Sequence, residues 1–74
     1  MVDDIDPAVP AWLAAFAEQL GVPAPTDDEF ATLLELAGIA ARGSARQAAP
    51  IACWLVARAG VTPTHAAALA AYII

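Results

Sequence analysis

The chain has 74 residues, of which 61% are hydrophobic, and a formal net charge of −5. This length predicts one small domain spanning residues 1–74, which would bury only about 60% of the surface that its unfolded chain exposes. The negative charge argues against nucleic acid or an anionic membrane surface as a partner, because both attract basic proteins. One cysteine and one histidine cannot supply an internal disulfide or the four side-chain ligands of a structural zinc site.

Charge is distributed unevenly along the chain. All eight acids precede residue 36, and all three cations, Arg42, Arg46 and Arg58, follow residue 41. Residues 1–6, MVDDID, are expected to form a short acidic tail, which lacks the basic start of a signal peptide. Charges, prolines and glycines keep every apolar run below the roughly 18 residues that cross a bilayer. We therefore expect a cytoplasmic protein with an acidic end and a weakly basic end.

The first helix is predicted to begin at Asp6-Pro7, an acidic cap followed by proline, and to end at Gly21. A short stiff connector, VPAP, follows it. The apolar residues of this segment recur at helical spacing and form one stripe: Val9, Trp12, Leu13, Phe16 and Leu20.

The second helix is predicted to begin at Thr26, because Thr26 and Glu29 have the spacing of a capping box, and to end at Gly43. Leu36 and Ile39 broaden its apolar face beyond what one neighbouring helix would cover, so we expect them to be exposed. The residues expected to share the buried face are Phe30, Leu33, Leu34, Ala37 and Ala41.

A third helix is expected to start close to Pro50 and to run to Ala59, before Gly60. A fourth is expected to start at Thr62-Pro63 and to continue to the C-terminus. No segment alternates with the period of a strand, and the connectors are short. The predicted fold is all-α, a compact bundle of four short helices.

Catalytic and metal-binding patterns are not found in the sequence. His65 has no partner acid or nucleophile at helical spacing and is interpreted as a solvated surface residue. Cys53 lies in an apolar stretch and is interpreted as an inert buried thiol. The three consecutive acids at 27–29 are explained by helix capping and the helix dipole. We expect no enzyme activity and no bound cofactor.

The segment RGSARQAAPIACWL, residues 42–55, holds two of the three cations and leaves two interpretations open. In one, Arg42 and Arg46 are solvated or pair with acids from the first half of the chain. In the other, Arg46 and Gln47 lie beside the N-terminus of the third helix, where unpaired N–H groups and the arginine fork would bind an anion or a carboxylate.

The longer stretch ARGSARQAAPIACWLVARAG resembles the signature A-x-G-x-x-R-P-x-A-P-[LI]-x-x-[FY]-L-x-G of a small, all-helical actinobacterial family of unknown function. The sequence departs from that pattern at Gln47, where proline is common, at Trp54 in the aromatic position, and at Ala57, where glycine is frequent. The W-L pair of the family's opening helix is also present. The matching residues are Trp12, Leu13, Ala41, Gly43, Arg46, Ala49, Pro50, Ile51 and Leu55.

Members of that family occur beside or fused to molybdopterin-guanine dinucleotide synthesis proteins and near formate dehydrogenase genes. The resemblance therefore implies a non-catalytic accessory protein or small subunit of a molybdenum-cofactor-dependent oxidoreductase, or of the maturation of its cofactor. The expected partner is a larger protein, such as a molybdoenzyme or a molybdenum-cofactor nucleotidyltransferase. Two alternatives are a module that binds a nucleotide or pterin phosphate, and a self-associating helical protein that forms a homo-oligomer. The predicted partner-binding residues are Arg42, Arg46, Gln47, Pro50, Trp54, Leu36 and Ile39.

Overall fold

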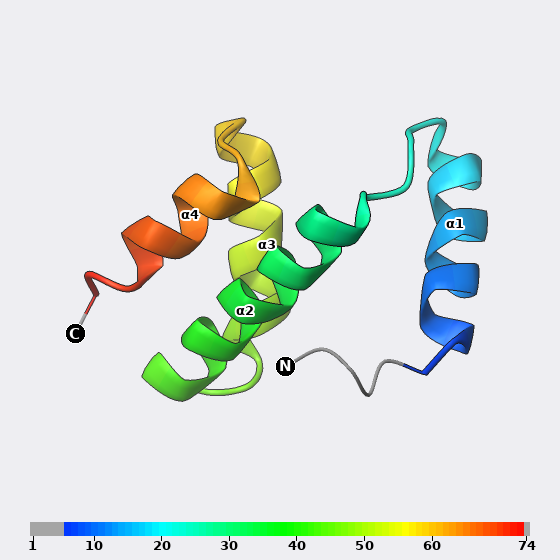
Figure 1. Cartoon of the computed structure of the whole chain (residues 1–74). Coiled ribbons are helices and arrows are strands. Elements are labelled where there is room, and N and C mark those ends of the chain that lie inside the picture. Colours follow the sequence, from blue (N-terminus) through cyan, green and yellow to red (C-terminus); the bar gives the residue numbers. More distant parts are fainter. Residues whose placement is uncertain (1–5, 74) are drawn as a thin grey trace.

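A computed structural model of the chain describes residues 6–73, which form four helices and, within that range, no strand. The predicted fold class, an all-α bundle of four short helices, is confirmed. Of the predicted acidic tail, only Asp6 belongs to the described residues. Figure 1 shows the helices in chain order: α1 (Ala8–Leu20), α2 (Asp27–Gly43), α3 (Ala48–Ala59) and α4 (Pro63–Ala70).

Polar caps and glycines set most helix ends where the sequence predicts them. At the start of α1, Asp6 Oδ1 accepts a hydrogen bond of 2.9 Å from the backbone N–H of Ala8. Gly21 and Gly60 follow α1 and α3 in the left-handed conformation, with φ of 75° and 74°, which glycine adopts without a Cβ clash.

The threonine caps predicted for α2 and α4 are confirmed. Thr26 Oγ1 accepts a hydrogen bond from the backbone N–H of Glu29 at 3.1 Å, and Glu29 Oε1 accepts one from the N–H of Thr26 at 2.8 Å. In α4, Thr62 Oγ1 accepts a hydrogen bond of 3.1 Å from the N–H of His65. Each cap satisfies a donor that the first turn would otherwise leave without a partner.

The third helix starts close to Pro50, as predicted: its first residue is Ala48, and Pro50 lies inside its first turn, where the missing N–H of proline does no harm. The predicted end of the fourth helix is wrong, because that helix ends at Ala70, before the C-terminus. The N–H groups of Tyr72 and Ile73 donate to carbonyls only three residues back, so the chain leaves the helix through a turn.

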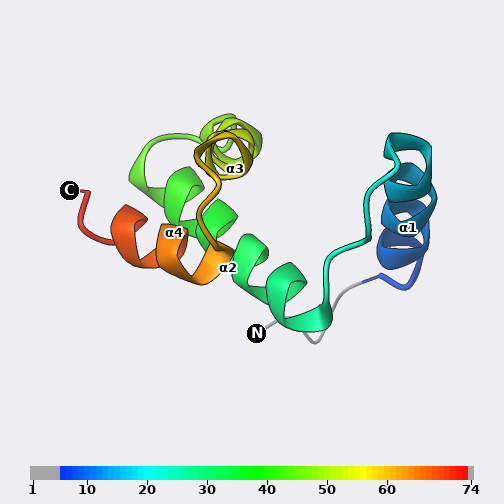
Figure 2. The ribbon, with the colours of Figure 1, turned by 90° about the horizontal axis from the view of Figure 1, so that it is seen from above.

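The second helix is the centre of the packed part of the molecule. It packs against both α3 and α4, which lie on different sides of it (Figures 1 and 2). The core consists of Leu36 with Ala66 and Ala67 of α4. Alanine lets the axes of α2 and α4 approach closely, so one leucine is enough to fill the space between them. Half-buried apolar residues surround this core: Leu33, Cys53, Val56, Val61 and Ala70.

The buried face of α2 is rotated from the one that the sequence predicts. Leu36, expected to be exposed, is only 3% exposed, whereas Leu34, expected in the core, is 44% exposed. The reason is the position of α4, which packs against the side of α2 that carries Leu36. The pattern of α2 is apolar over a wide arc, so only the neighbouring helices determine which part of that arc is buried.

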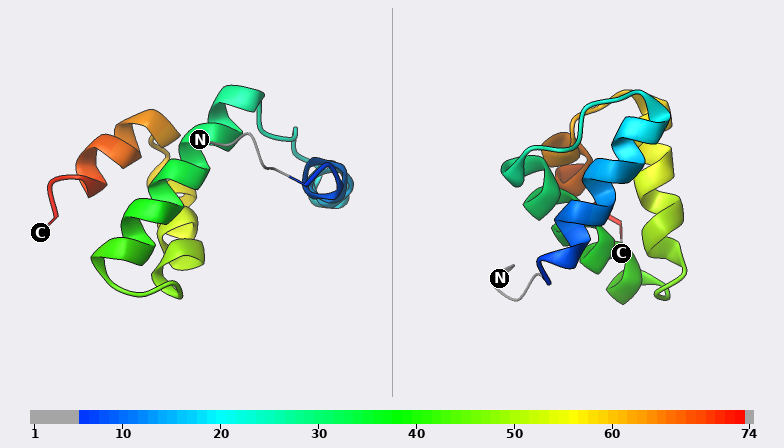
Figure 3. Two further views of the ribbon diagram at one scale, coloured as in Figure 1. Left: turned by 60° about the horizontal axis from the view of Figure 1, so that its bottom comes forward. Right: turned by 90° about the vertical axis from the view of Figure 1, so that its right-hand side faces the viewer.

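The first helix lies apart from the other three (Figure 2 and the left-hand view of Figure 3). Its apolar stripe is present, with the rings of Trp12 and Phe16 5.1 Å apart, but no other helix covers it. Only Ala17 is buried within α1. The helix that carries some of the largest apolar side chains of the chain thus contributes least to its core.

Candidate functional site

The end of α2, the following loop and the start of α3 form what we call the basic corner, residues 42–47. Both of its arginines, Arg42 and Arg46, are exposed. The guanidinium of Arg42 folds back along α2 over Gly38, because a Cβ built on that glycine would lie 2.9 Å from Arg42 Nη1. The corner therefore presents two guanidinium groups to solvent, one along α2 and one before α3.

The N-terminus of α3 does not offer the unpaired donors that the sequence predicts. The N–H groups of Ala48 and Ala49 donate to the carbonyl oxygens of Ala45 and Arg46 at 2.9 and 3.1 Å, and Pro50 has no N–H. Gln47 occupies the capping position without a side-chain hydrogen bond. The expectation of unpaired N–H groups is thus wrong for Ala48 and Ala49, and the guanidinium groups are the principal donors of the corner.

Beside the basic corner lies an apolar groove of about 220 Å³, which we call the α2–α3 groove. Gly43 and Ser44 of the corner form part of its wall. Arg42 is the chain neighbour of Gly43, and Arg46 lies two residues from both Ser44 and Ala48. The guanidinium of Arg42 lies over Gly38, about 200° around α2 from Leu36, and so on another side of that helix. An apolar hollow in the same corner as the exposed Arg46 suits a ligand surface that carries an apolar side chain and a carboxylate. The lining residues are Leu36, Ile39, Ala40, Gly43, Ser44, Ala48, Ala52, Ala70 and Ile73.

The structure brings together some of the predicted partner-binding residues. Leu36 and Ile39 line the groove, and the exposed side chains of Arg42, Arg46 and Gln47 belong to the corner beside it.

The other two predicted residues lie elsewhere. Trp54 is two residues after Ala52, about 200° around the helix, so it lies on a different face of α3. There the guanidinium carbon of Arg58 lies 5.0 Å from the centre of the Trp54 ring. Pro50 is exposed and does not line the groove.

Sequence reasoning missed Ala48, Ala52 and Ala70 as lining residues of the groove. The signal that could have indicated the two α3 residues is the pair of small residues at positions i and i+4, which marks a face where a helix approaches its neighbour closely. Ala70 comes from α4, and no local pattern predicts that it meets α2 and α3.

The alternative of intramolecular pairing for the arginines finds no support at hydrogen-bond distance. The side-chain hydrogen bonds among residues 6–73 all join groups at most four positions apart, and none of them involves an arginine.

A second hollow, of about 370 Å³, lies between α2 and α4 and has Glu35 as its one charged lining residue.

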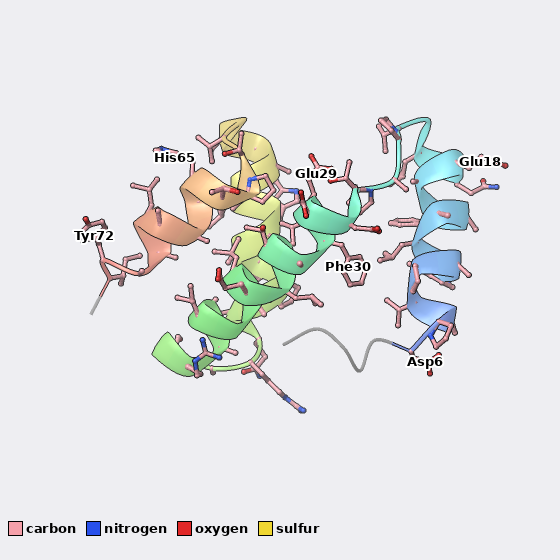
Figure 4. The ribbon with its side chains drawn as sticks, in the orientation of Figure 1. Asp6, Glu18, Glu29, Phe30, His65 and Tyr72 are labelled. Carbon is pink, nitrogen blue, oxygen red and sulfur yellow. The ribbon has the colours of Figure 1, made fainter. Side chains whose placement is uncertain are left out.

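Cys53 and His65 lie in the environments that the sequence predicts. Cys53 is half-buried against the core, and this burial raises the pKa of its thiol. A raised pKa leaves little thiolate at neutral pH, which is the property of an unreactive cysteine. His65 is exposed near the start of α4 (Figure 4). Within residues 6–73, no three side chains among His, Cys, Asp and Glu are arranged to hold a metal ion.

The fold and the groove define a small all-α domain with one apolar hollow beside a basic corner. A family model described as "Domain of unknown function (DUF6457)" matches residues 5–74 of the chain. The chain belongs to this family. The resemblance to a family of unknown function is therefore confirmed, while the actinobacterial origin and the genomic setting that it implies stay predictions.

No curated protein and no solved structure matches the chain. Among residues 6–73 there is no helix that is both long enough and apolar enough to span a membrane.

Proposed function

We propose that the protein is a non-catalytic accessory protein or small subunit, which binds a larger protein through the α2–α3 groove and the basic corner. The observation that supports this proposal is their adjacency: Gly43 and Ser44 of the basic corner line an apolar hollow, and the same corner carries two of the three cations of a chain with a net charge of −5. Arginine is enriched at protein interfaces, where its planar fork recognises carboxylates. The partner would insert an apolar side chain into the groove and place a carboxylate against Arg46.

The setting of this interaction comes from the resemblance to the family signature. It places the proposed partner among molybdenum-cofactor-dependent oxidoreductases of the formate dehydrogenase type, or among the nucleotidyltransferases that mature their cofactor. The chain would act in the cytoplasm, where its one cysteine stays reduced.

The test is a native pull-down with the tagged chain as bait, followed by identification and reconstitution of the captured protein. We expect a molybdoenzyme or a cofactor nucleotidyltransferase, and we expect Arg46→Ala to reduce its recovery at least about tenfold. Because Arg46 is exposed, the same change should alter the free energy of unfolding by no more than about 0.5 kcal/mol. Arg58→Ala, an arginine removed from another face of α3, serves as the matched control and should retain the partner.

A clean preparation of the bait with no bound protein would contradict the proposal, as would equal losses with Arg46→Ala and Arg58→Ala. The alternative of a bound nucleotide or pterin phosphate has less support, because the N–H groups of Ala48 and Ala49 already have acceptors. A rise in melting temperature with added GTP that disappears in Arg46→Ala would favour that alternative.

A further inference from the structure

Two apolar faces of the molecule are left without a covering helix. The α1 face consists of Val9, Trp12, Phe16 and Leu20, which are 42–63% exposed. The α3 face consists of Ile51, Trp54 and Leu55, which are 54–60% exposed, with Arg58 one turn further on. Each set recurs at three or four residues and therefore occupies one side of its helix.

The connector between α1 and α2 keeps the α1 face away from the rest of its own chain. It contains Pro23 and Pro25, and the capping box at Thr26 anchors its far end to α2. Proline-rich segments are extended and semi-rigid, so this connector acts as a spacer. Figure 4 shows Phe30 on the side of α2 towards α1, and Glu18 on the side of α1 away from α2. The α1 face is thus turned towards the other helices of its own chain, and the connector holds it at a distance from them.

The size of the two faces suits an interface. The three aromatic side chains of the two faces are 47–63% exposed, and each leaves on the order of 100 Å² uncovered, because an aromatic residue buries 150–250 Å² when fully enclosed. The four smaller aliphatic side chains add to this area. Together the seven side chains approach the roughly 800 Å² that each partner contributes to a standard protein–protein interface. The 13 residues of α1 and the 12 residues of α3 also give helices of nearly equal length.

The charges of the two segments are complementary. From Asp6 to Gly21 the chain has two acids, Asp6 and Glu18, and no cation, whereas from Arg46 to Gly60 it has two arginines and no acid. In an antiparallel pairing, Asp6 at the start of α1 would lie beside Arg58 near the end of α3. Opposite potentials of this kind guide association and fix the orientation of the partners.

We infer that two copies of the chain form a symmetric dimer, in which the α1 face of each copy packs antiparallel on the α3 face of the other. A second copy can cover both faces while the connector keeps its conformation. A pairing of the two faces within one chain would require the connector to bend. The exchange is isologous, so every contact occurs twice. Trp54 belongs to this interface instead of the α2–α3 groove, which stays open for the proposed partner. The inference therefore does not rest on the proposed function.

Sedimentation equilibrium over a range of concentrations tests the dimer. We expect the mass to rise from 7.6 kDa to twice that value with increasing concentration. Trp12→Ala and Trp54→Ala should each weaken association at least about a hundredfold, because the symmetric interface loses a tryptophan anchor twice. Tyr72→Ala removes an aromatic side chain that is 84% exposed beyond α4 and should leave association unchanged. Circular dichroism of each variant verifies that its helices are formed.

A mixing experiment distinguishes exchange between copies from closure within one chain. Asp6→Arg and Arg58→Glu should each weaken self-association several-fold at low salt, because like charges then meet twice. An equimolar mixture of the two variants should restore it, because the heterodimer contains one native and one reversed ion pair.

Three results would overturn the inference. One is a wild-type chain that stays at 7.6 kDa at every concentration, as closure of α1 on its own chain requires. Another is a dimer that Trp12→Ala does not weaken. The third is an equimolar mixture of Asp6→Arg and Arg58→Glu that associates no more strongly than either variant alone.

Discussion

The packed part of the molecule, formed by α2, α3 and α4, has a core of small side chains, whereas the large apolar side chains of α1 lie outside it. The core contains one leucine and two alanines, Leu36, Ala66 and Ala67, whereas Trp12 and Phe16 of α1 are 63% and 47% exposed. Hydrophobicity alone would favour the opposite arrangement, since the aromatic residues have more surface to bury. Burial in this chain follows from how closely two helix axes approach, and alanine permits that approach where tryptophan prevents it.

The connectors of the two regions differ as well. The α2–α3 loop is short, and the carbonyl oxygens of Ala45 and Arg46 in this loop accept hydrogen bonds from the first two N–H groups of α3. The connector after α1 is proline-rich and acts as a spacer. An amphipathic pattern therefore predicts that a helix has a face to bury, but the connector determines which surface can reach that face.

The largest effect on stability is expected from the centre of the core. Leu36→Ala should lower the free energy of unfolding by about 2–5 kcal/mol, because it leaves a cavity between α2 and α4. The same substitution in α1, Leu20→Ala, should cost less than about 1 kcal/mol in the monomer, because Leu20 is exposed. Urea unfolding at low protein concentration measures both values. Equal losses would show that α1 belongs to the packed core and would remove the difference between the two regions.

An intermediate effect is expected from the cap of α4, the short helix that supplies the two core alanines. Thr62→Ala should lower the free energy of unfolding by about 1 kcal/mol, because the N–H of His65 loses its acceptor. Thr64→Ala is the matched control, since Thr64 is exposed and makes no side-chain hydrogen bond among residues 6–73. Thermal unfolding followed by circular dichroism compares the two. Losses of the same size in both variants would rule out the cap as the cause.

The smallest effect has the opposite sign and comes from Gly38, in the interior of α2. Gly38→Ala should raise the free energy of unfolding by about 0.5–1 kcal/mol, because alanine is a better helix former. The nearest atom to the new methyl group is the mobile Nη1 of Arg42, which can move away. Gly60→Ala should instead lower it by about 1 kcal/mol, since Gly60 has a φ of 74°. A loss of stability in Gly38→Ala would mean that the position of the Arg42 guanidinium is constrained.

Local signals in the sequence were sufficient for the elements of the fold. The capping box at Thr26 and Glu29 and the glycines at 21 and 60 have the predicted roles, because each acts through hydrogen bonds or dihedral angles within a few residues. Leu34 was predicted to be buried and is exposed, whereas Leu36 was predicted to be exposed and is buried. The exposure of these two residues depends on which side of α2 receives α4, and no local pattern contains that information.

The candidate site also has one part that the sequence predicts and one part that it does not. The cluster of Arg42, Arg46 and Gln47 is visible in the sequence, because residues in one short loop are close in space wherever the loop lies. The α2–α3 groove is not, because it forms only where residues from three helices meet. The separation of Trp54 from that groove follows from the rotation of α3 about its axis, which its packing on α2 sets.

By itself, the sequence determined that the chain is all-α, where most of its helices begin and end, and that its positive charge gathers around one loop. These properties depend on backbone dihedral angles, caps and composition, all of which act over a few neighbouring residues. Only the tertiary structure decided that alanine and Leu36 form the core, that a groove opens beside the basic corner, and that the aromatic face of α1 has no cover within its own chain. Those properties depend on the distances between helices, which result from the packing of residues far apart in the sequence.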